Sequence, residues 1–323
     1  MKAALLYCII AAAASSAAPD WECTDVALPD GNGLVAHKAR VCYKPTLTTP
    51  SDPSALHVFG HGDGGGGPLI HGYDRALSTL TDAGFVVASY LSCWVDTPCG
   101  PGGSLDFLEF YKTIVAIQGD SELSQLVNFD VPVTLSGHSS GARAVLMAAA
   151  LKENPNTFMQ DYEEVTGMSD EMKAARDMVG AVVANHPDAM YLEKYNPDIP
   201  NYNISRTPAM ILTGTADIIE KEGSAWRVFS DIASPDKIFA NVDRAVHSEI
   251  VLQHRGMALT AAFSKLFGTG DERERAALYA PGGLAEDAPI AGGDGARNNG
   301  GAGGYLACEE GGGYPADVRE FCA

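Results

Sequence analysis

Short apolar runs, rich in β-branched residues, recur along the chain between polar turns that contain glycine or proline. They lie at residues 55–62, 84–91, 131–135, 178–185, 208–214 and 237–242, after a looser alternating stretch at 34–43. Stretches rich in helix formers separate them, at residues 73–83, 105–126, 142–151, 223–232 and 248–267. Apolar strands that alternate with helices are typical of a parallel sheet covered on both faces. The pattern predicts one α/β domain over residues 19–267.

The two ends of the chain depart from this pattern. A basic start precedes an apolar run at residues 3–14 and small residues at 15–18. This composition predicts a secretory signal peptide at residues 1–17, because the run is too short to span a membrane comfortably. Residues 268–323 are rich in glycine and polar residues and are predicted to form a tail that supplies no core.

Charge narrows the range of partners. The 323-residue chain carries a formal net charge of −19. Nucleic acid and anionic membrane surfaces are poor partners for an acidic protein, because like charges repel. After the N-terminus no apolar run is long enough for an integral membrane span. The oligomeric state does not follow from these features.

Removal of the predicted signal peptide leaves an even number of cysteines, which fits an oxidising compartment. We favour the pairs that are local in sequence, with free or cross-paired cysteines as alternatives: Cys23–Cys42, Cys93–Cys99 and Cys308–Cys322. No Cys-x-x-Cys pair and no histidine cluster occurs, so neither a metal site nor a cofactor is expected. Asn203 begins a glycosylation sequon, Asn203-Ile204-Ser205.

The strongest functional pattern is Gly137-His138-Ser139-Ser140-Gly141, which fits Gly-x-Ser-x-Gly. An apolar strand precedes it and a helix-forming stretch follows, which is the context of a nucleophile elbow. A turn without chemistry can show the same five residues. The flanking elements favour Ser139 as a nucleophile, with its hydroxyl lifted out of the sheet beside a helix N-terminus.

A serine nucleophile needs a base, and the base needs an orienting acid. Asp217 follows a predicted strand, where open α/β sheets place active residues, and His247 directly precedes the last predicted helix. Glu220 and Asp188 are reserve acids. His254 also follows Asp217, but it falls inside the helix pattern and is expected to be a surface or packing residue.

Two backbone amides are expected to form the oxyanion hole, those of Ser140 and Asp63. Asp63 and the glycine-rich loop after it follow the strand that ends in His61-Gly62, and His61 is expected to brace this loop. The loop lacks the Lys-Ser/Thr of a phosphate-binding loop. The predicted substrate pocket lies at strand ends and includes Gly64, Trp94, His138 and His186.

These motifs together resemble the α/β-hydrolase superfamily. The resemblance is carried by His61-Gly62, Gly137 to Gly141, Gly214-Thr215-Ala216-Asp217 and Ala245-Val246-His247, over roughly residues 30–267. Within the superfamily the chain is similar to dienelactone hydrolase-like, chlorophyllase-like and cutinase- or polyester hydrolase-like enzymes. Asp63 and four glycines replace the aromatic residue that polyester hydrolases often carry, which argues against a polyester substrate.

The expected function is a secreted serine hydrolase that cleaves small-molecule or polymeric carboxylic esters through an acyl-enzyme intermediate. A serine peptidase on the same scaffold is one alternative, although the chain lacks a large extra domain to gate peptides. A non-catalytic binding protein is another, which the complete set of Ser139, Asp217 and His247 disfavours.

Overall fold

The computed structural model describes residues 20–29, 38–63, 65–92, 106–156, 165, 167–188, 202–219, 222–242, 244–252, 255–279, 297–298 and 304–306. The described strands form one sheet in the order β1-β2-β4-β3-β5-β6-β7-β8-β10-β9. Their bounds are β1 Glu22–Ala27, β2 Lys38–Tyr43, β3 Leu56–Gly60, β4 Val86–Tyr90, β5 Val133–His138, β6 Val179–Asn185, β7 Ala209–Gly214, β8 Lys237–Val242, β9 Arg297–Asn298 and β10 Gly304–Leu306.

The sheet is parallel from β4 to β10, while β1, β2 and β9 pair antiparallel. Strand β5 lies near the middle, between β3 and β6. The sequence prediction of an α/β fold with a mostly parallel sheet is confirmed. A central parallel strand is buried on both faces, which explains the continuous apolar runs.

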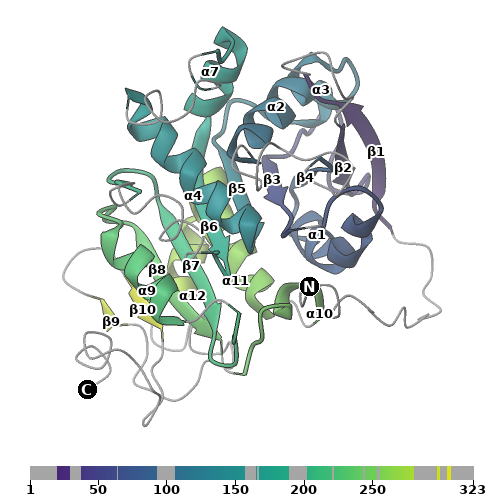
Figure 1. Ribbon diagram of the computed structural model, residues 1–323. Coiled ribbons are helices and arrows are strands. Elements are labelled where there is room, and N and C mark those ends of the chain that lie inside the picture. The colour runs from purple at the N-terminus through teal and green to yellow at the C-terminus, as the bar shows by residue number, and fades with distance from the viewer. Residues whose placement is uncertain are drawn as a thin grey trace, which may run out of the picture.

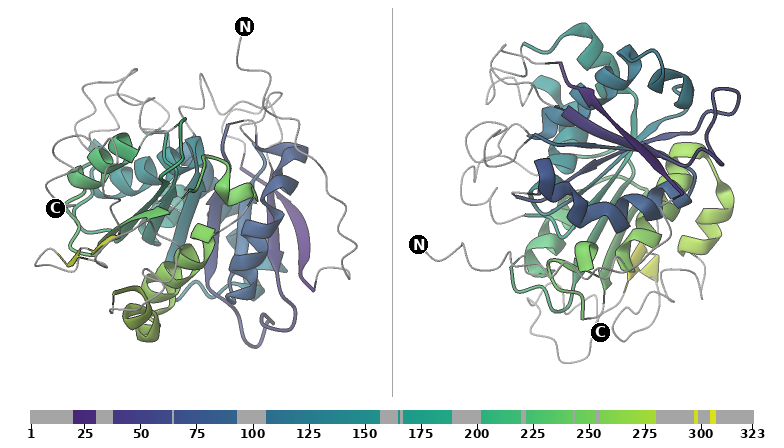
Figure 2. Two further views of the ribbon diagram at one scale, coloured as in Figure 1. Left: turned by 90° about the horizontal axis from the view of Figure 1, so that it is seen from below. Right: turned by 90° about the vertical axis from the view of Figure 1, so that its right-hand side faces the viewer.

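Helices cover both faces of this sheet (Figures 1 and 2). One face packs against α2 Asp106–Gly119, α4 Ser140–Glu153, α7 Asp170–Asp177 and α9 Glu222–Asp231. The other packs against α1 Asp74–Asp82, α11 Arg255–Ser264 and α12 Glu272–Tyr279. Neighbouring residues on one strand serve opposite faces: Val182 packs in the first core and Val183 in the second.

Helix α4 is enclosed by the protein. Residues 140–151 are all buried, and the helix contacts β3, β5, β6 and α2. A helix buried on every side belongs in a core, and the alanines of α4 let the neighbouring elements approach closely. The first turn of α4, which begins at Ser140, is thereby fixed against the centre of the sheet.

Several predicted helices are divided. The stretch at 105–126 forms α2 and a short α3, Leu123–Leu126, because the Asp120 carboxylate accepts the Glu122 and Leu123 amides between them. The predicted helix at 73–83 corresponds to α1, and a 3-10 helix, η1 Gly67–Tyr73, directly precedes it. The closing stretch forms α10 Glu249–Leu252, α11, and a π-helix, η3 Lys265–Thr269.

Packed structure continues past residue 267, where the sequence predicts the tail to begin. Leu278 on α12 is buried in a core cluster with Phe263 of α11. Strand β10 pairs with β8 at the edge of the sheet. Thus residues 272–279 and a short strand of the predicted tail belong to the folded domain.

A disulfide joins Cys23 to Cys42 across the paired strands β1 and β2, as the local pairing predicts. The other predicted disulfide residues, the signal peptide and most of the tail lie outside the described residues. Within the described part of the chain, no helix has the length and apolar character that crossing a bilayer requires.

Candidate active site

The turn between β5 and α4 holds Ser139 in a strained conformation. Its φ is 56° and its ψ is −118°, a combination that costs free energy for a residue with a side chain. A Cβ on Gly137 would lie 2.3 Å from the Gly141 carbonyl oxygen, and one on Gly141 would lie 2.4 Å from the Gly60 carbonyl oxygen. The two glycines therefore allow α4 to begin directly against β5 and β3.

The structure brings Ser139, Asp217 and His247 together from three separate loops. His247 Nε2 lies 2.9 Å from Ser139 Oγ, and His247 Nδ1 lies 3.0 Å from Asp217 Oδ2. When Nδ1–H donates to the carboxylate, Nε2 presents its lone pair to the serine hydroxyl. The carboxylate thus selects the imidazole tautomer that can accept a proton from serine.

The loops that carry Asp217 and His247 are in direct backbone contact. A Cβ on Gly214, the last residue of β7, would lie 2.1 Å from the Ala245 carbonyl oxygen. The Ala216 amide donates to the same oxygen over 3.1 Å. Glycine at position 214 is therefore required for the loop of Asp217 to pass beside the loop of His247.

Asp217 is buried and surrounded by hydrogen-bond donors. Its Oδ2 accepts from His186 and His247, and its Oδ1 accepts from the Ile219 amide over 2.9 Å. Burial alone would raise the pKa of Asp217, but the bonds from His186 and His247 outweigh it and hold the pKa below its ordinary value. The carboxylate is therefore ionised wherever the protein is folded near neutral pH.

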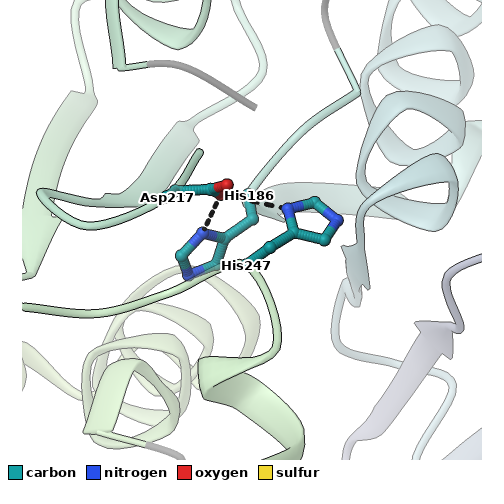
Figure 3. Close-up of side chains that lie close together, drawn as sticks. All are labelled: His186, Asp217 and His247. Atoms are coloured by element: carbon teal, nitrogen blue, oxygen red, sulfur yellow. Dashed lines mark hydrogen bonds and ion pairs between the residues drawn. The ribbon is translucent and has the colours of Figure 1, made fainter. Parts of the chain in front are cut away.

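A second histidine, His186, shares this carboxylate (Figure 3). Its Nδ1 lies 2.8 Å from the Asp217 oxygen that His247 contacts, so both rings point at one atom. His186 is buried and has a φ of 50°. The sequence predicts His186 as a pocket residue, whereas the structure directs its ring at the acid. His186 follows β6 and Asp217 follows β7, and these strands are neighbours in the sheet. A predicted strand order would have indicated that the two residues lie close together.

His138, also predicted in the pocket, is buried within a hydrogen-bonded chain. The Gly62 amide donates to Tyr73 Oη over 3.0 Å, and Tyr73 Oη lies 2.9 Å from His138 Nδ1. His138 Nε2 lies 2.7 Å from the His247 carbonyl oxygen. Burial, followed by the neighbouring His247 and His186, holds the pKa of His138 well below its ordinary value, so its ring is neutral. These hydrogen bonds link the loop of Gly62 to the backbone of His247, and sequence reasoning did not single out Tyr73.

The two predicted oxyanion donors lie at the start of a helix and in the loop after β3. Ser140 is the first residue of α4, where an amide has no intrahelical acceptor. The Gly62 amide donates to Tyr73 Oη, and Asp63, whose amide is the predicted donor, follows Gly62 in the loop. His61 braces this loop as predicted: its Nδ1 lies 2.8 Å from the Gly62 carbonyl oxygen, and its Nε2 lies 2.7 Å from that of Ser92.

The glycines that follow Asp63 have a packing role. A Cβ on Gly66 would lie 2.7 Å from His61 Nε2 and from the carbonyl oxygens of Leu91 and Ser92. A Cβ on Gly65 would lie 2.9 Å from the Tyr73 ring. These two glycines let the loop fold tightly against the end of β4.

A buried arginine supports the elbow from behind. Arg143 Nη1 lies 3.1 Å from Asp188 Oδ2, and Arg143 Nη2 lies 3.5 Å from Asp106 Oδ2. The Asp188 amide also donates to the Ser139 carbonyl over 3.2 Å. Asp188, the weaker reserve acid, thus forms an ion pair with Arg143. Burial raises the pKa of Asp106 to about 7, against the opposing effect of Arg143.

The remaining predicted residues are the glycosylation site, two pocket residues, a reserve acid and the second downstream histidine. Asn203 is exposed at the surface with a φ of 49°. Gly64, Trp94, Glu220 and His254 lie outside the described residues.

Comparisons with known proteins bear on the fold. No protein-family model matches the chain, and no curated protein matches it in sequence. A dienelactone hydrolase from Anabaena variabilis superposes with a TM-score of 0.48 at 17% identity, covering 77% of this chain and 100% of the other. An esterase from Pyrococcus furiosus superposes with a TM-score of 0.50 at 13% identity, covering 77% and 93%. At such identities the likeness concerns the fold, and this chain has the α/β-hydrolase fold.

Proposed function

We propose that this protein is a secreted serine hydrolase that cleaves carboxylic esters. The observation that carries the proposal is the continuous hydrogen-bonded path from Ser139 Oγ through His247 to Asp217 Oδ2, with steps of 2.9 Å and 3.0 Å. Ser139 lies on a strained strand-to-helix turn. The three residues follow the carboxyl ends of parallel strands, where α/β sheets position their active residues.

In the proposed mechanism Ser139 Oγ attacks the ester carbonyl carbon while His247 Nε2 accepts the serine proton. The ionised Asp217 stabilises the imidazolium that forms. The amides of Ser140 and Asp63 stabilise the oxyanion, and His247 then donates its proton to the leaving alcohol. Water attacks the acyl-enzyme with the same base and regenerates Ser139.

Two histidines would act as positioning residues in this scheme. His138 holds the His247 backbone through a bond of 2.7 Å, and its neutral ring adds no charge beside the base. His186 donates to Asp217 Oδ2 over 2.8 Å and helps to hold the carboxylate in place beside His247. Preorganised groups of this kind lower the reorganisation needed when the transition state forms.

Secretion is supported by the disulfide between Cys23 and Cys42, since disulfides persist in oxidising compartments. The test is expression of the full chain in a secreting host, followed by N-terminal sequencing of the exported protein. A mature start near residue 18 is expected. Retention in the cell with residues 1–17 intact would contradict this part of the proposal.

Activity is tested with p-nitrophenyl esters of acyl length C2 to C16, using protein made in an oxidising compartment. Hydrolysis by the unmodified protein and its loss in Ser139→Ala are expected. A fluorophosphonate probe provides a check that is independent of the ester chosen, because it labels an activated serine. A folded protein that neither hydrolyses esters nor reacts with the probe would contradict catalysis, and cleavage of peptides but not esters would favour a peptidase.

A further inference from the structure

Two imidazole rings and a carboxylate converge at one point of the site. His186, Asp217 and His247 each offer a ligand atom, and these atoms lie within 4.8 Å of one another. Figure 3 shows both rings directed at the carboxylate from different sides. Imidazole nitrogen and carboxylate oxygen are ligands that zinc accepts, usually in tetrahedral geometry with one position left for water.

The spacing is close to what such an ion needs. The two nitrogens lie 2.8 Å and 3.0 Å from Asp217 Oδ2. Tetrahedral zinc with bonds of about 2.0–2.1 Å holds its ligand atoms about 3.3 Å apart. The three ligand atoms lie within 4.8 Å of one another, so a three-ligand site requires the two rings to turn from the carboxylate toward a common ion.

We propose that His186, Asp217 and His247 form a binding site for Zn²⁺, and that the bound ion inhibits the enzyme. The inhibition rests on the proposed hydrolase function, whereas the binding does not. A buried, ionised carboxylate attracts a cation, and the net charge of −19 reinforces that attraction.

Inhibition follows from the tautomer of His247. In the catalytic arrangement Nδ1 carries the proton and Nε2 holds the lone pair that faces Ser139 Oγ over 2.9 Å. Zinc takes the lone pair of Nδ1, so the single proton of the neutral ring moves to Nε2 through solvent. His186 changes tautomer in the same way, and zinc loses bound waters without net release of a proton. Ser139 then faces an N–H donor and has no base.

His186 is the residue that makes this site possible. An Asp–His pair alone offers two ligands, and the chain contains such a pair at its surface. There, His71 Nδ1 lies 3.1 Å from Asp74 Oδ2, and both side chains are exposed. The surface pair is an internal control for binding that needs only one imidazole and one carboxylate.

The binding test uses Ser139→Ala protein without a histidine tag, so that its result is independent of catalysis. Cobalt(II) replaces zinc as a spectroscopic probe, since tetrahedral Co²⁺ gives visible absorption bands. We expect one ion per chain, displaced by Zn²⁺. His186→Phe in the same background should abolish the bands, and His71→Phe should leave them unchanged. Absence of binding, or binding that survives His186→Phe, would overturn the site.

The inhibition test uses the unmodified chain, so its result does not depend on whether a substituted protein folds. Zn²⁺ should slow fluorophosphonate labelling of Ser139 by about 10²-fold or more, because general-base assistance contributes about 10²–10⁴-fold. Removal of zinc with a chelator should restore the rate. Stoichiometric binding with an unchanged labelling rate would overturn the inhibition. A chain that never labels but binds one Co²⁺ through His186 would refute the hydrolase and leave the metal site standing.

Discussion

Two hydrogen bonds between histidine and serine side chains in the described part of the chain have opposite characters, one within strands β3 and β5 and the other at the carboxyl end of β5. In the core, His57 Nε2 lies 2.6 Å from Ser136 Oγ, with Thr134 Oγ1 2.9 Å from the other ring nitrogen. At the strand end, His247 Nε2 lies 2.9 Å from Ser139 Oγ, with the Asp217 carboxylate on the other nitrogen. Burial lowers the pKa of His57 to about 3, so this ring cannot accept a proton near neutral pH. A histidine–serine hydrogen bond alone therefore does not indicate a catalytic site. The carboxylate beside His247 and the strained turn at Ser139 distinguish the candidate site from the core pair.

The largest effect is expected from paired serine substitutions. Ser139→Ala should lower kcat on the order of 10⁶-fold, the loss seen when a triad serine is removed. Ser136→Ala should leave kcat nearly unchanged, because Ser136 is buried beneath the elbow. Ester hydrolysis and fluorophosphonate labelling of the two variants provide the comparison. Similar losses in both folded proteins would abolish the distinction between the two histidine–serine pairs.

Asp217→Asn should lower kcat by about 10⁴-fold, because an amide favours the wrong tautomer of the base. The substitution turns the partner of His247 into a neutral group, as Thr134 is for His57. Kinetics with a short p-nitrophenyl ester measure the loss, and circular dichroism checks the fold. A loss smaller than about tenfold would mean that another acid, such as Asp188, orients the base.

Tyr73→Phe should lower kcat by about 10–100-fold with little change in KM. The variant loses the hydroxyl that accepts from Gly62 and contacts His138, so the oxyanion loop and the base lose their connection. Affinity for a boronic acid that mimics the tetrahedral intermediate should fall in parallel with kcat. Unchanged inhibitor affinity would show that Tyr73 acts only in packing.

His57→Phe should affect stability rather than activity, by about 1–3 kcal/mol near pH 7, because two buried hydroxyls lose their partner. Unfolded His57 gains a proton below the ordinary histidine pKa of 6.5, and folded His57 gains one only near 3. Wild-type stability is therefore fully present above pH 6.5 and falls between these values by up to about 1.4 kcal/mol per pH unit.

The phenylalanine variant lacks this proton uptake, so the stability difference should narrow when urea unfolding is repeated near pH 5. His57→Gln, which keeps a polar group but does not titrate, should show the same narrowing. A stability difference that stays constant between pH 7 and pH 5 would mean that His57 takes up its proton near pH 6.5 in the folded protein as well.

The parts of the fold that depend on local sequence were predictable. Continuous apolar strands, the helix after the elbow, and the glycines around Ser139 follow from residues near one another in the chain. The break between α2 and α3 was missed because Leu123 and Leu126 continue an apolar pattern, while the Asp120 carboxylate caps the next turn. Periodicity registers apolar positions and does not register one capping side chain.

The arrangement around the acid was less predictable. His186 and Asp217 are 31 residues apart and meet because β6 and β7 are adjacent in the sheet. Tyr73 reaches His138 across 65 residues, from the end of a 3-10 helix whose position depends on tertiary packing. The pairing of Arg143 with Asp188 likewise requires α4 to lie against the end of β6.

The near contact of Gly214 with the Ala245 carbonyl limits how this protein could be engineered. The loops that carry Asp217 and His247 share a backbone hydrogen bond and leave no room for a Cβ between them. Recombination between related proteins at a crossover point between β7 and β8 would combine two loops that had not been fitted to each other. Libraries meant to change substrate range should therefore exchange residues 214–247 as one cassette.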